Sequence, residues 1–198
     1  MAARMTAFGY ILTVFVVTVM IKMYLESDAF NLKCIVSEVD GNRYCVRERM
    51  KLQLAADLLA RVTGKLKRTV AGLAAKYPDQ ERVQRLRDGF NPKKVCEILP
   101  SSSYTAYSEN KGEKLAFCTT TTKEGDALSD ENTLTFVGLH EISHIMTKSV
   151  GHTDEFWKNF KFVLAHAAKA GLYRPEDYKK KHKDYCGMQI TDNPYYDL

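Results

Sequence analysis

The feature that most constrains this sequence is an almost wholly apolar segment that carries two histidines and one glutamate. From residue 134 to residue 146 the chain reads LTFVGLHEISHIM. Apolar residues would cover most of the circumference of a helix, which predicts a buried helix capped by Asn132 or Thr133. Buried polar side chains without partners are costly, so the histidines and the glutamate need a common explanation.

The spacing of these residues, His140, Glu141 and His144, is the HExxH pattern. With about 3.6 residues per turn, residues four apart lie on one helix face, so both imidazoles can reach one metal ion. Glu141 lies beside the first ligand and can reach a metal-bound water. The pattern therefore predicts a Zn²⁺ site in which Glu141 is the catalytic general base.

A catalytic zinc usually takes three protein ligands and leaves its fourth position to water. Gly151 can adopt the left-handed conformation that turns a chain back after a helix, and His152 follows it directly. Thr153 can cap the next helix, with Asp154 and Glu155 in its first turn. We therefore expect His152 to be the third ligand.

The stretch HEISHIMTKSVGHTDEFW resembles the small gluzincin-like zinc metallopeptidases of the WLM, YgjP-like and SprT-like group. The similarity covers residues 140 to about 164, with weaker similarity at 104–118 and 185–194. The resemblance implies an α+β, minigluzincin-like fold in which a small antiparallel sheet packs on the HExxH helix. It also implies that His140, His144 and His152 are the ligands and that Glu141 is the base.

The resemblance further suggests that a substrate strand adds beside the sheet edge, at residues 115–121, where backbone pairing provides affinity. Two features depart from related patterns. The gap between His144 and His152 is two residues longer than usual in the WLM and YgjP-like members, and Thr147 occupies the glycine position of the metzincin pattern. We therefore expect Met188 to be a packing residue rather than a metzincin Met-turn.

The N-terminal segment is the second constraint. Residues 7–21 read AFGYILTVFVVTVMI without a charge, and with their neighbours they provide about 20 residues, enough to cross a bilayer. Arg4 and Lys22 can extend to the two interfaces. Residues 1–25 are therefore predicted to be a single-pass membrane anchor. A cleaved signal peptide, with a small-x-small site at Ser27-Asp28-Ala29, and a buried hydrophobic helix are the alternatives. The flanking charges do not set the side of the membrane.

The remaining residues, 31–198, are expected to form one metallopeptidase domain. Residues 34–39 and 43–46 predict a hairpin in which Cys34 and Cys45 face each other, either as a disulfide or as free thiols. Apolar residues at three- and four-residue spacing predict a long helix over 54–73, and a shorter one should end near Gly89. Two further strands are expected at 103–107 and 113–122.

The net charge of +5 is mild, and its one local concentration lies at residues 179–183. Such runs are usually solvated, so we do not expect a nucleic-acid partner. The sequence predicts a membrane-tethered zinc peptidase that acts on a protein or peptide. The alternatives are a non-catalytic, membrane-anchored binding protein that zinc stabilises and a DNA-associated protease of the WLM type.

Overall fold

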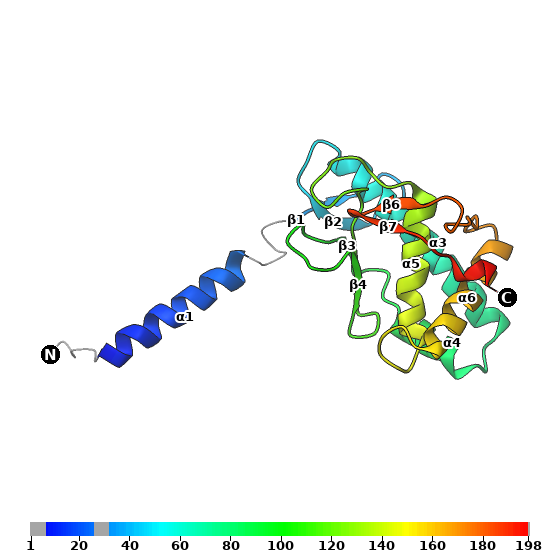
Figure 1. Ribbon diagram of the computed structural model, residues 1–198, viewed down its shortest axis with the longest axis horizontal. Helices are drawn as coiled ribbons and strands as arrows, with labels where there is room; N and C mark the ends of the chain where they lie inside the picture. The colour runs from blue at the N-terminus through cyan, green and yellow to red at the C-terminus, as the bar shows by residue number, and fades with distance from the viewer. Residues whose placement is uncertain (1–6, 26–31, 198) are drawn as a thin grey trace.

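The computed structural model describes residues 7–25 and 32–197, which form an α+β protein (Figure 1). The helices and strands of this part of the chain follow in sequence order: α1 (Ala7–Leu25), β1 (Leu32–Val36), β2 (Arg43–Arg47), α3 (Leu52–Lys76), α4 (Glu81–Gly89), β3 (Val95–Glu97), β4 (Ala106–Glu109), β5 (Lys114–Phe117), α5 (Glu131–Met146), α6 (Asp154–Lys169), β6 (Lys183–Tyr185), β7 (Met188–Ile190) and a 3-10 helix (Pro194–Tyr196).

The main sheet has five strands in the order β1-β2-β3-β5-β4. The pairs β1–β2 and β4–β5 are antiparallel, whereas β3 runs parallel to both β2 and β5. The expected antiparallel sheet is therefore wrong, and the sheet is mixed. Strand β3 was not predicted, because its three residues are all buried and so show no alternation. The chain reaches β3 through α3 and α4, and a crossover of this kind brings it back parallel to β2.

The expected edge strand at residues 115–121 is also wrong. β5 lies between β3 and β4, and the strand at this edge is β4. Leu115, Ala116 and Phe117 are all fully buried, as is typical of an inner strand that is covered on both faces.

The long helix α3 follows the predicted periodicity. Its residues at positions 58, 59, 62, 66, 70 and 73 are buried, and only Leu54 of the predicted set is exposed. The shorter helix α4 ends at Gly89 as expected. Helix α5 packs against α3, α4 and α6 and against strand β4, which places the HExxH segment between the helical layer and the edge of the sheet (Figure 1).

The caps of the two site helices are only partly as predicted. Asp130 caps α5 by accepting from the Thr133 backbone N–H, so neither Asn132 nor Thr133 is the cap. The Asn132 side chain instead contacts the Arg174 backbone. Thr153 caps α6 as expected, by accepting from the Phe156 N–H.

Two disulfides cross-link the strands, one within the main sheet and one between that sheet and the β6–β7 hairpin. Cys34 and Cys45 are bonded across the paired strands β1 and β2, which settles the open alternative in favour of a disulfide. A second bond, Cys118–Cys186, joins the end of β5 to the turn of the β6–β7 hairpin and was not predicted. Cys96 is a buried thiol.

Helix α1 is long and apolar enough to cross a membrane, and the window Ala7–Tyr24 is 0% buried. Among the described residues it is the one helix with this property, and an N-terminal signal sequence has the same property. The hydroxyls of Thr13 and Thr18 donate to the carbonyls of Gly9 and Val14, so both hydroxyls are satisfied within the helix. Arg4 and the small-x-small site at residues 27–29 lie outside the described residues.

Candidate metal centre

The structure brings together the three histidines that the sequence singled out. The Nε2 atom of His140 lies 3.2 Å from Nε2 of His144 and 3.0 Å from Nε2 of His152. One ring nitrogen from each histidine lies within 4.8 Å of the other two. Three nitrogen donors at this spacing surround a single point, so the cluster could hold a metal ion.

Helix geometry places the first two histidines. His140 and His144 lie one turn apart on α5, and their rings pack against aromatic side chains of α6. The His144 ring stacks on Phe156 with 4.2 Å between centroids, and the His140 and Phe160 rings form a T-shaped pair with 5.1 Å between centroids. These contacts restrict both rings to the orientation in which their Nε2 atoms converge.

A loop places the third histidine. Helix α5 ends at Met146, five residues before Gly151, so the helix does not extend to the glycine turn. Gly151 nevertheless has the expected left-handed backbone, with φ at +83°. His152 follows with its ring 5.6 Å from that of Trp157. The longer gap between the second and third ligands is thus an irregular loop, residues 147–153.

Burial keeps the two helical imidazoles neutral. It lowers the pKa of His140 to about 3, with smaller effects from the charges of His144 and His152. Burial likewise lowers the pKa of His144 to about 4. A neutral imidazole is the form that binds a metal, so at neutral pH these two residues are ready to act as ligands.

Glu141 is a buried carboxyl group in the same cleft as the histidines. Burial raises its pKa to about 8. It does not belong to the group of potential ligands, which among the described residues contains only the three histidines. Glu141, next to His140 on α5, is therefore a buried carboxyl group outside the set of potential ligands.

A cleft of about 730 Å³ leads to the histidines. Its walls come from α5, α6, β4 and the β6–β7 hairpin, and most of its surface is apolar. Tyr185 lies in this lining, but its hydroxyl donates to the Thr105 carbonyl. Met188 is 47% exposed and lines the cleft, so the prediction that it is a packing residue is wrong.

The structure brings His140, His144 and His152 together and places Glu141 in the same cleft, as the sequence predicted, but the side chains that support the loop were not predicted. Lys111 and Glu155 contact the loop that precedes His152 and carry no sequence signal of that role. His166 and His182, which lack ligand spacing, do not join the cluster.

Comparison with known proteins identifies relatives but no activity. No family model matches the chain, and no solved structure matches it. Similar proteins include an uncharacterized protein of Acanthamoeba polyphaga mimivirus, 31% identical over 99 residues, which are 50% of each chain. Another, from Invertebrate iridescent virus 6, is 38% identical over 93 residues, which are 46% of this chain and 51% of the relative. A third, from Invertebrate iridescent virus 3, is 34% identical over 99 residues, 50% of this chain and 57% of the relative. The chain therefore spans about half the length of the curated relatives it matches.

Proposed function

We propose that this protein is a zinc-dependent peptidase that hydrolyses peptide bonds with Glu141 as its general base. One observation carries the proposal: three imidazole nitrogens surround a point in an open cleft, beside a buried carboxyl group that is not itself a ligand. Neutral imidazoles suit zinc well among the common first-row metals, because zinc accepts nitrogen ligands in a tetrahedral arrangement.

The number of ligands favours a catalytic site over a structural one. A structural zinc is closed by a fourth protein ligand. Among the described residues no cysteine, aspartate or glutamate joins the three histidines, and no cysteine of the described residues lines the cleft. The alternative of a non-catalytic protein that zinc merely stabilises therefore has less support.

The residues of the cleft divide the chemistry between them. A bound zinc would lower the pKa of a water to about 7 and polarise a carbonyl group. Glu141 would accept the proton of that water and pass it to the leaving amine. Burial raises the pKa of Glu141 in the metal-free protein, and the positive charge of a bound zinc would lower it again and so favour the carboxylate form that accepts a proton. The apolar walls exclude bulk water and accept the apolar side chains of a peptide.

We also propose that α1 is a single-pass membrane anchor. The helix offers an apolar span of 18 residues, and its two threonine hydroxyls are satisfied internally, as a bilayer requires of polar groups. The competing signal peptide would be removed. Sequencing the N-terminus of the mature protein and extracting its membranes with alkaline carbonate separate the two: an anchor stays on the chain and remains in the membrane fraction.

The DNA-associated alternative has little support from the basic segment at residues 179–183. Lys179 lies 3.1 Å from Asp192 and 3.0 Å from Asp197, and Lys180 lies 3.0 Å from Asp177. Lys183 pairs with Asp130 and Glu176. Carboxylates neutralise most of this run, which leaves little charge for phosphate groups.

The central test is the Glu141→Gln variant of the full chain. Because only the proton acceptor is lost, we expect this variant to bind one zinc per chain and to cleave unfolded casein at least about 100-fold more slowly than the parent protein, since general base catalysis contributes about 10²- to 10⁴-fold. Zinc is measured by atomic absorption and cleavage by the release of amines. Equal cleavage by the variant and the parent would contradict the proposal.

A further inference from the structure

The loop at residues 147–153 joins the second and third histidines of the candidate centre and has no regular secondary structure. We infer that Glu155 is a positioning residue that holds this loop in the shape that presents His152, before any metal binds. The inference rests on the metal centre proposed above but does not depend on peptidase activity.

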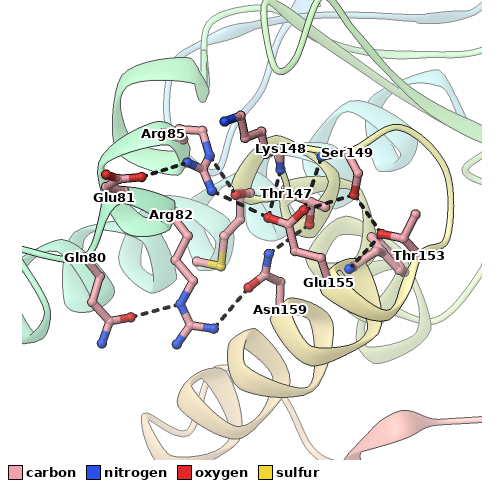
Figure 2. A network of polar contacts seen from close by, with 12 residues as sticks. Gln80, Glu81, Arg82, Arg85, Thr147, Lys148, Ser149, Thr153, Glu155 and Asn159 are labelled. Carbon is pink, nitrogen blue, oxygen red and sulfur yellow. Dashed lines mark hydrogen bonds and ion pairs between the residues drawn. The ribbon is translucent and has the colours of Figure 1, made fainter.

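The Glu155 carboxylate binds the N–H groups of the loop (Figure 2). Its Oε1 atom accepts from the Lys148 backbone N–H at 3.1 Å, and its Oε2 atom accepts from the Ser149 backbone N–H at 3.2 Å. The Ser149 hydroxyl also donates to Oε2, at 3.0 Å. These hydrogen bonds replace those that a continuing helix would have provided for the same N–H groups.

A lysine binds the carbonyl groups of the same loop. The Nζ atom of Lys111, in the turn between β4 and β5, lies 2.9 Å from the Thr147 carbonyl oxygen and 3.0 Å from that of Ser149. One carboxylate thus holds the donors of the loop while one ammonium group holds its acceptors. The polarity of each partner matches the backbone group that it contacts.

Two neighbouring helices fix the position of this arrangement, as Figure 2 shows. Arg85 of α4 lies 3.6 Å from Glu155 and donates to the Met146 carbonyl at 3.1 Å. Asn159 of α6 donates to the Thr147 hydroxyl at 3.0 Å, and both residues are buried. The loop is therefore tied at its start to the helical core and, through Lys148 and Ser149, to Glu155.

A loop that is ordered in advance improves metal affinity, because the free energy of ordering it is not lost when the ion binds. Removal of a residue that orients a ligand typically weakens metal binding by about 10- to 100-fold. His152 is the ligand that depends most on such support, since it is exposed and lies outside any helix.

The test compares Glu155→Gln with Glu81→Gln in the full chain. Both carboxylates pair with Arg85, at 3.6 Å and 3.8 Å, but Glu81 makes no hydrogen bond to the described residues of the loop. Zinc affinity is measured by competition with a chromophoric chelator. We expect Glu155→Gln to weaken zinc binding about 10- to 100-fold and Glu81→Gln to leave it within about twofold.

A double-mutant comparison separates positioning from general destabilisation. In a His152→Ala background, Glu155→Gln should leave zinc affinity unchanged, because the residue acts only through His152. In the metal-free protein, the Lys148 and Ser149 amide hydrogens should exchange faster in Glu155→Gln than in the parent.

Three results would overturn the inference: parent-like zinc affinity in Glu155→Gln, an equal loss in the His152→Ala background, or unchanged amide exchange at residues 148 and 149. A parent protein that fails to bind zinc would overturn the metal centre and this inference together. A parent that binds zinc without cleaving any peptide would contradict the peptidase proposal alone.

Discussion

The two halves of the candidate metal centre are held by different forces. His140, Glu141 and His144 lie within little more than one turn of α5, and the backbone hydrogen bonds of that helix set their spacing. His152 lies beyond an irregular loop whose shape depends on side chains from α4, α6 and the β4–β5 turn. The helical half is thus fixed by local geometry and the loop half by tertiary contacts, so the two should respond differently to mutation and pH.

Removal of a ligand should have the largest effect and should differ between the halves. His140→Ala is expected to weaken zinc binding by well over about 100-fold, the upper range for loss of a residue that only supports a ligand. His140 has the central position, since its Nε2 atom is within 3.2 Å of both other ring nitrogens. His152→Ala should be milder, because two ligands remain on one helix. Chelator competition measures the zinc affinity of both variants. A larger loss of affinity in His152→Ala than in His140→Ala would contradict the prediction.

The buried carboxyl group of the helical half should make the metal-free protein sensitive to alkali. Burial raises the pKa of Glu141 to about 8 from 4.5, so between these pH values the folded state holds a proton that the unfolded state releases. Stability should therefore fall as pH rises through this window and level off above about pH 8, with a total change of a few kcal/mol at about 1.4 kcal/mol per pKa unit.

The matched control for this prediction is Glu141→Gln. Urea unfolding of both metal-free proteins from pH 6 to pH 9 gives the difference in their free energies of unfolding, in which the opposite effect of the buried histidines cancels. A difference that does not change over this range would show that Glu141 is ionised in the folded protein at neutral pH.

Lys111→Met tests the loop half with a smaller expected effect. The change leaves the carbonyl groups of Thr147 and Ser149 without their charged donor, which should cost about 1–2 kcal/mol of stability, near the lower range for hydrogen bonds to charged groups because Lys111 is exposed. Lys94→Met, which removes the exposed pair with Glu113, is the matched control and should cost less. Urea unfolding measures the free energy of unfolding of both variants. An equal loss of stability in the two would show that the contacts of Lys111 with the loop contribute no more than an exposed ion pair.

Gly151→Ala should have the smallest effect and act only through the backbone. Gly151 has a φ of +83°, and a methyl group added there would meet no other atom within 4 Å. We expect a loss of about 1 kcal/mol from the left-handed conformation alone. Gly64 also has open space but lies inside α3, so Gly64→Ala should stabilise the protein by about 0.5–1 kcal/mol. Thermal unfolding of the two variants should therefore shift in opposite directions.

The difference between positions set by local helix geometry and positions set by tertiary contacts explains what the sequence could predict. Residues whose roles follow from local spacing were brought together as expected, as with His140 and His144 and with the periodic positions of α3. The mixed sheet was not predicted, because β3 is too short and too buried to show a pattern. Lys111 and Cys186 meet their partners only through tertiary folding, and no local signal marks either of them.

The position of Trp157 has a practical consequence. It is the single tryptophan of the sequence, it is 44% exposed, and its ring lies 5.6 Å from that of His152. Its ultraviolet emission should therefore come from one known site at the rim of the cleft. An unlabelled sample in a fluorimeter would report, in real time, when the nearby imidazole gains or loses an ion and when a peptide covers the indole.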